Sequence, residues 1–244
     1  MKHKKRVISL MLGLIMLFGI CDTTFASNMS DDEFLLSTGM SQEEIDNMDP
    51  DIKEYIVANL RASTVGQEVE YIHAEASAVM QNRSIQPLSG ITFSAPAWQA
   101  GGIIHIYPTY EFTTAKRPKG ADGFAFEFGN ALDPYEYGGK IWCKDINGVD
   151  WLDSGSMVAN LQSITGAGFT GNQLGTPDFD VYLKGCTYAK AVAGSGSSKK
   201  ITMQYMHNPN KRSYSLSFSY QGIGFGFSSS QTIYTAASTV MLSY

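Results

Sequence analysis

The sequence predicts a mainly β protein, an antiparallel β-sandwich of jelly-roll type preceded by a short acidic helical segment. From Gly90 onward, aromatic and β-branched residues alternate with polar ones, as in 124–128 (Phe-Ala-Phe-Glu-Phe), and a period of two is typical of strands. Twenty of the 24 glycines lie in this part and separate the runs, together with Pro, Asn and Ser. No helix-length periodic segment stands between the runs, which favours an antiparallel sandwich or barrel over a parallel sheet.

The acidic leader, residues 27–63, predicts two short helices. Ser41 and Glu44 have the spacing of a capping box, in which each side chain bonds to the other residue's exposed backbone amide. Asp49-Pro50 ends the first helix and starts the second, whose apolar residues recur at helical spacing. Such an apolar stripe either covers the body of the protein or binds a partner. Residues 64–89 have a mixed pattern and stay unassigned, as a linker, and the β-sandwich domain is expected over 90–244.

The first residues have the features of an export signal. Lys2, Lys4, Lys5 and Arg6 precede an apolar run over 7–20, and Thr24-Phe25-Ala26 offers small residues where a signal peptidase reads them. We therefore expect a signal peptide over 1–26, cleavage near Ala26-Ser27 and a secreted protein. No later apolar run is longer, so the mature chain is expected to have no transmembrane segment.

Two cysteines remain after Cys21 leaves with the signal. Cys143 and Cys186 form an even set in an oxidising compartment, where a disulfide is the default. A reactive or metal-binding pair is the alternative, although there is no Cys-x-x-Cys. The sequence indicates no metal site and no cofactor.

Charge divides the chain. From Ser27 to Ser89 twelve acids face three Lys and Arg residues, whereas from Gly90 eleven Lys and Arg residues face ten acids. Neither part has the basic stripe that replaces the counterions of phosphates, so nucleic acid is excluded as a partner. An acidic leader is either a solvated surface or a docking face for a basic partner.

The sequence matches to known catalytic motifs are incomplete. Residues 166–171 spell a dinucleotide-binding pattern, but no helix can follow them, so they are interpreted as a glycine-rich loop. Asp153-Ser154-Gly155 lacks the flanking glycines of a serine-protease loop. His105 is expected to hydrogen-bond within or beside the sheet, and His207, before a turn sequence, to lie exposed at a strand end.

Three glutamates between aromatics keep a glycoside hydrolase open. Glycoside hydrolysis needs two carboxylates facing each other about 5 to 9 Å apart, and Glu111, Glu127 and Glu136 are the candidates. Residues 133–137 (Asp-Pro-Tyr-Glu-Tyr) are loosely similar to the nucleophile strand of some jelly-roll xylanases, although no matching acid strand is visible. Glu111 and Glu127 also fit the solvated face of a strand, where a charge needs no function.

Residues 120–126 (Gly-Ala-Asp-Gly-Phe-Ala-Phe) resemble the Ala-Asp-Gly signature of legume-type, concanavalin-A-like lectins, and they follow a strand and a loop. In that family the aspartate accepts hydrogen bonds from sugar hydroxyls, a role that the resemblance implies for Asp122. The resemblance covers these seven residues only, and the calcium- and manganese-binding strand of the family is not found. Asp122-Gly123 also fits an ordinary turn before a strand.

Residues 213–228 support a different function. Ser alternates with Leu, Phe and Tyr, and after a possible turn Gly alternates with Ile and Phe, which predicts an uncharged hairpin with one apolar face. A membrane-inserting hairpin needs this pattern, although each strand is shorter than the roughly 9–11 residues that span a bilayer. A half-buried hairpin of a water-soluble sandwich has the same pattern.

The sequence therefore predicts a secreted, non-enzymatic β-sandwich protein that binds an extracellular ligand, either a glycan or a cell surface. The candidate ligand-binding residues are Asp122, Gly123, Tyr135 and Glu136. The alternatives are a pore-forming or antimicrobial protein that uses the hairpin and, less favoured, a glycoside hydrolase. The oligomeric state is not predicted.

Overall fold

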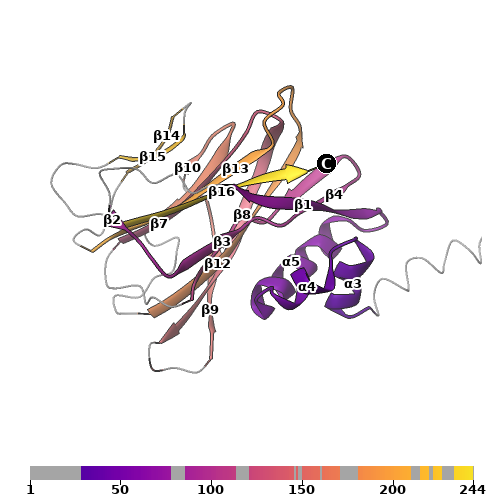
Figure 1. Ribbon diagram of the computed structural model, residues 1–244, viewed down its shortest axis with the longest axis horizontal. Helices are drawn as coiled ribbons and strands as arrows, with labels where there is room; N and C mark the ends of the chain where they lie inside the picture. The colour runs from indigo at the N-terminus through magenta and orange to yellow at the C-terminus, as the bar shows by residue number, and fades with distance from the viewer. Residues whose placement is uncertain are drawn as a thin grey trace, which may run out of the picture. The chain divides into compact units, whose positions relative to one another are not determined.

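The computed structural model describes residues 29–77, 86–113, 121–145, 147, 150–159, 161–170, 181–209, 215–219, 222–226 and 234–243. The expected signal peptide and its cleavage site lie outside these ranges. The chain divides into two compact units, one ending at Glu70 and one beginning at Tyr71. The first contains helices and the second strands (Figure 1).

The first unit has three helices: α3 (Asp31–Ser37), α4 (Gln42–Asp46) and α5 (Pro50–Ser63). The predicted capping box is confirmed, since the Glu44 amide donates to Ser41 Oγ at 3.3 Å and the Ser41 amide donates to Glu44 Oε2 at 3.0 Å. Pro50 occupies the first turn of α5. The prediction of two helices was one short, because Ser30 and Glu33 form a second capping box and begin α3.

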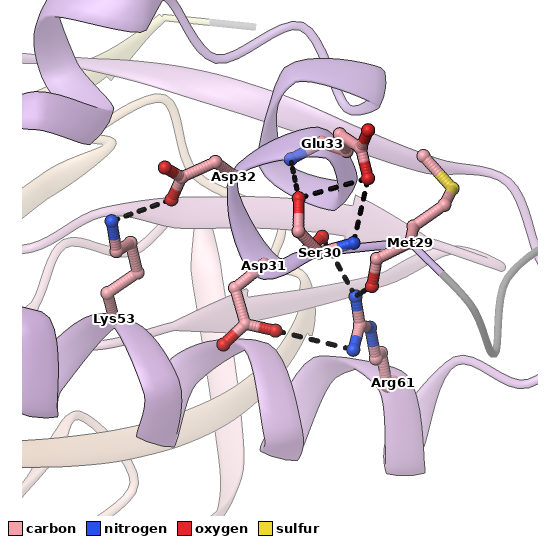
Figure 2. A network of polar contacts seen from close by, with 7 residues as sticks. All are labelled: Met29, Ser30, Asp31, Asp32, Glu33, Lys53 and Arg61. Carbon is pink, nitrogen blue, oxygen red and sulfur yellow. Dashed lines mark hydrogen bonds and ion pairs between the residues drawn. The ribbon is translucent and has the colours of Figure 1, made fainter.

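Arg61 of α5 holds the start of α3 (Figure 2). Its Nη2 donates to the carbonyl oxygens of Met29 at 2.6 Å and Ser30 at 3.1 Å, and Nη1 lies 3.3 Å from Asp31 Oδ1. Lys53, which also lies in α5, forms an ion pair with Asp32, with 2.6 Å between Nζ and Oδ1. These contacts attach α3 to α5 by charge as well as by packing.

The second unit is an antiparallel β-sandwich, as predicted. Its strands are β1 (Val69–Ser77), β2 (Gln86–Pro87), β3 (Ile91–Ser94), β4 (Ala97–Ala100), β5 (Ile103–Ile106), β6 (Thr109–Phe112), β7 (Ala121–Phe128), β8 (Leu132–Asp145), β9 (Leu152–Met157), β10 (Leu161–Gln162), β11 (Gly166–Thr170), β12 (Val181–Ala193), β13 (Lys200–Asn208) and β16 (Tyr234–Ser243). One layer, called the β7 layer, has the strand order β10-β11-β7-β13-β16-β1 and continues through β4 into the other, called the β12 layer. In the β12 layer, β12 lies between β8 on one side and β5 and β6 on the other. The hairpin of β14 (Ser215–Ser219) and β15 (Gly222–Gly226) forms a separate two-stranded sheet.

An aromatic core fills the space between the two layers. Tyr110 of the β12 layer lies with its ring centroid 4.8 Å from Phe124 and 4.9 Å from Tyr205 of the β7 layer. Phe126 contacts Tyr137 across the same space at 6.0 Å. The core explains why apolar and polar residues alternate in the sequence, since every second residue of each strand points toward the opposite layer.

The predicted start of the β domain and the predicted loop at 166–171 are both wrong. The β unit does not begin at Gly90, because β1 lies in the unassigned stretch and pairs with β16 along five positions from His73 to Ser77. Residues 166–170 are not a loop but strand β11, paired with β7. Gly166 is needed there because a Cβ atom would lie 2.1 Å from the carbonyl oxygen of Phe126.

The expected disulfide is not formed, and both Cys143 and Cys186 are free. Cys143 is the register partner of Leu183, whereas Cys186 is the partner of Lys140. The two thiols are thus three residues apart in register, roughly 10 Å along the strands, and an odd offset places them on opposite faces of the sheet. A disulfide needs Cα atoms about 4.4–6.8 Å apart, so this pairing cannot close.

Candidate ligand-binding face

The four predicted ligand-binding residues fall into two places. Asp122 and Gly123 lie in β7, whereas Tyr135 and Glu136 lie in β8 of the opposite layer. No ladder joins these strands, since β7 pairs with β11 and β13, and β8 with β12 and β9. The structure therefore does not unite the four residues in one site.

Asp122 is fully buried and belongs to the interior. Its Oδ1 lies 2.9 Å from His207 Nδ1, and the two residues are register partners between β7 and β13. His207 is also buried, so its expected exposed position is wrong. Because β7 places Asp122 on the same face as Phe124, the carboxylate points into the sandwich rather than from a surface loop. Sugar binding by Asp122 stays an untested prediction.

Tyr135 marks a β-bulge on the surface. Lys190 of β12 pairs with Glu136, whereas the next residue, Ala191, pairs with Pro134, so Tyr135 is the extra residue between them. A bulge bends its strand and re-aims the side chain. Tyr135 is 52% exposed. No local pattern predicts this bulge, because the register of β8 depends on its partner strand β12.

The ladder residues that follow Tyr135 carry charged and polar groups. Lys190 Nζ lies 2.8 Å from Glu136 Oε1, and the side chain of Glu136 is 43% exposed. Tyr188 bonds to Glu136, and its pKa is raised by burial first and then by the negative charge of Glu136. Tyr188 lies across Gly138, where a Cβ would come within 2.5 Å of its ring. The end of the β8–β12 ladder therefore combines a half-exposed tyrosine with a carboxylate, an ammonium and a hydroxyl group.

Lysines and aromatic rings continue along the same face of the ladder. We call it the lysine–aromatic strip, made of Glu136, Lys140, Trp142 and Lys144 of β8, Tyr182, Lys184, Tyr188 and Lys190 of β12, and Trp151 before β9. The ammonium of Lys184 lies 4.4 Å from the centroid of Trp151, and that of Lys144 lies 4.9 Å from it. Sequence reasoning missed this strip. The alternation of 182–190 places its even-numbered residues on one face, but only the pairing with β8 brings the tryptophans beside the lysines.

His105 extends the row that contains Glu136 and Lys190. It is the register partner of Lys190 on one side and of Trp98 on the other. The expected hydrogen bond within the sheet is absent, since both ring nitrogens are buried and have no hydrogen-bond partner among the described residues. Burial lowers the pKa of His105, the charge of Lys190 lowers it further, and Glu136 partly opposes this. The imidazole is therefore held neutral.

The described residues also bear on metal sites, membrane spans and glycoside hydrolysis. Within them, no group of three or more His, Cys, Asp or Glu side chains is placed to hold a metal ion. In the same part of the chain, no helix has the length and apolar character to cross a membrane. The three glutamates considered for glycoside hydrolysis lie on β6, β7 and β8, and Glu136 is ion-paired with Lys190.

Comparison with known proteins yields only distant structural likeness. No protein-family model and no curated protein matches the chain. Similar solved structures include a pore-forming protein (7% identity, TM-score 0.38, covering 73% of this chain and 96% of that one). Others come from studies of Streptococcus parasanguinis Fap1 fimbriae (14%, 0.36, 69% and 89%) and of ACE19, the collagen-binding subdomain of the Enterococcus faecalis surface protein ACE (3%, 0.31, 67% and 94%). These scores assign no function to this chain.

Proposed function

We propose that the protein is exported and binds a carbohydrate outside the cell through the exposed end of the β8–β12 ladder. The observation that carries this proposal is Tyr135, a half-exposed residue on a β-bulge that precedes Glu136, the ion-pair partner of Lys190. An aromatic ring offers a flat apolar surface for the apolar face of a sugar. Charged groups at its edge hydrogen-bond to hydroxyl groups more strongly than neutral ones do.

The same groups explain why binding is favoured over catalysis at this position. Glu136 is shared between Lys190 and Tyr188, so these two contacts orient its carboxylate. Such a group is suited to accept hydrogen bonds from a polyol, whereas a general acid must be held protonated. A glycoside hydrolase remains the less favoured proposal.

Glycan-array and calorimetric binding to the secreted protein tests the proposal. Tyr135→Ala removes the stacking surface, and Glu136→Gln removes a charged acceptor worth about 1.5–3 kcal/mol, so we expect an affinity loss of roughly 10-fold to 150-fold from the latter. Met241→Ala is the matched control, because Met241 is an exposed apolar residue on β16 of the opposite layer. Absence of carbohydrate binding by the wild type would reject the proposal.

A second candidate function is membrane insertion of the β14–β15 hairpin. These strands pair with each other and with no other described strand, so the hairpin is a separate sheet beside β7, β11 and β13 (Figure 1). A hairpin without ladder bonds to the sandwich can separate from it without breaking a sheet. Its residues are uncharged, as a membrane-inserting segment requires.

A further inference from the structure

Strand β7 contacts the β14–β15 hairpin although it lies inside its layer. Strands β11 and β13 flank β7 and pair with it on its two sides. Strand β15 contacts β7 and β13, and β14 contacts β11. Because both edges of β7 are occupied, the hairpin reaches it either across a face or past its end. The inner face packs on the aromatic core, so the outer face and the strand end remain.

Two buried side chains on the outer face of the β7 layer locate the hairpin. Phe124 points into the core, so its neighbours Gly123 and Ala125 face outward. Met206 is the register partner of Gly123 and shares this outward face. Ala125 and Met206 are both 0% exposed, although neither belongs to the core cluster between the layers. Both side chains are therefore covered from outside the sandwich.

The neighbours of Ala125 within the sheet do not account for this cover. Its register partners are Gly168 and Gln204, and Gly168 has no side chain to lay over it. Glu127 and Thr202 form the next row on the same face and are only half-buried. The cover is thus local, and the hairpin contacts all three strands that carry this part of the face.

We propose that the hairpin is a strap held on a seat made of Gly123, Ala125, Gly168 and Met206, and that its release from this seat limits its insertion into a lipid bilayer. This inference rests on the second candidate function and adds the step that controls it. The two glycines allow another backbone to approach the sheet closely. Among the described strands no ladder joins the hairpin to the sandwich, so contact with the seat sets how often the hairpin is free.

Amide exchange in the protein without lipid tests the seat. Ala125→Leu puts a larger side chain on the seat and leaves the aromatic core untouched, so exchange in residues 215–226 should become roughly 5-fold to 150-fold faster. Met206→Ala removes a seat contact and should act in the same direction. Thr202→Leu is the matched control, because it places the same side chain on the same face outside the seat. Unchanged exchange in both seat variants would overturn the inference.

Dye-filled vesicles of phosphatidylcholine and phosphatidylglycerol in equal amounts test the insertion step. Ala125→Leu should release dye faster than the wild type by about the same factor as its gain in exchange, since both rates follow the population of the free hairpin. Thr202→Leu should release dye at the wild-type rate. Faster exchange with an unchanged rate of dye release would overturn the inference, because release from the seat would then not limit insertion. Absence of dye release from the wild type and all variants would remove the second candidate function, whereas faster exchange would still place the hairpin on the seat.

Discussion

Asp122 and His207 form an interior pair, with 2.9 Å between the carboxylate Oδ1 and the imidazole Nδ1. Both side chains are buried at the end of the aromatic core, and the two strands that carry them are adjacent. A buried polar pair of this kind stabilises little overall, yet loss of one partner leaves the other unsatisfied in a medium of low polarity.

Asp122→Ala should therefore lower the free energy of unfolding by about 3–5 kcal/mol, and the melting temperature by roughly 10 °C, because His207 would lose its partner. Asp133→Ala is the control, since Asp133 is an exposed carboxylate on β8. Thermal unfolding followed by circular dichroism measures both. An unchanged melting temperature with weakened sugar binding would instead support the role that the lectin resemblance implies.

The two free cysteines predict how many thiols the protein has and how fast each reacts. The unfolded, non-reduced secreted protein should show two titratable thiols. In the folded protein Cys186 should react slowly with a neutral alkylating reagent, because it is fully buried and burial raises its pKa well above the ordinary value. Mass spectrometry after alkylation counts the thiols. A mass two hydrogens lower, with no alkylation, would mean that the strands have a different register.

His105 should make stability depend on pH. Its pKa is lowered in the folded protein from an ordinary value of 6.5, by burial and then by Lys190, with Glu136 opposing. The unfolded chain therefore takes up a proton first, and stability falls as the pH drops below about 6.5. His105→Phe removes the titratable imidazole and leaves no buried ring nitrogen without a partner. The melting temperature of this variant should therefore change less than that of the wild type between about pH 7 and pH 5.

Three neighbouring side chains surround His105 in the wild type and in the Phe variant. Lys190 and Glu136 are the charged groups that face it across β12 and β8, and Trp98 faces it from β4. At pH 7 the Phe variant should melt at the wild-type temperature or above it, since the ring face is kept. A pH profile parallel to that of the wild type would show that other groups cause the acid sensitivity.

Local patterns predicted much of this fold. The strands follow from strict alternation, and the capping box at Ser41 and the proline at position 50 locate two helices, because these signals depend only on near neighbours. Helix α3 had the same signal, with Ser30 and Glu33 three residues apart. The glycines of β11 predict a loop, but Gly166 serves a close approach to Phe126 that only the neighbouring strand reveals.

The candidate site was less predictable because it depends on register. Tyr135 and Glu136 were proposed from their local sequence, but the bulge that exposes Tyr135 results from a shift in pairing at Lys190. The positions of Cys143 and Cys186 depend on the same ladder. A one-residue change in register moves a side chain to the other face of the sheet, and the local sequence does not determine the register.

Arg61 should control the attachment of α3 to α5 (Figure 2). Arg61→Ala removes the donors to the carbonyl oxygens of Met29 and Ser30 and the pair with Asp31, so amide exchange in residues 31–37 should become faster. Lys53→Ala removes only a partly exposed ion pair, worth about 0.2–1 kcal/mol, and should change exchange little. Equal effects of the two variants would argue against a special role for the guanidinium group.

The hairpin prediction distinguishes membrane insertion from a water-soluble role. In the register of β14 and β15, Leu216 pairs with Phe225 and Phe218 with Ile223, whereas Ser217 pairs with Gly224. If the hairpin enters a bilayer, Phe218→Lys places a charge on the lipid-facing side at a cost of about 2–4 kcal/mol and should abolish dye release from liposomes. Ser217→Lys, one residue away on the other face, should preserve it. Dye release by neither variant nor wild type would remove the pore-forming candidate, and equal release by all three would show that the liposomes leak without insertion of this hairpin.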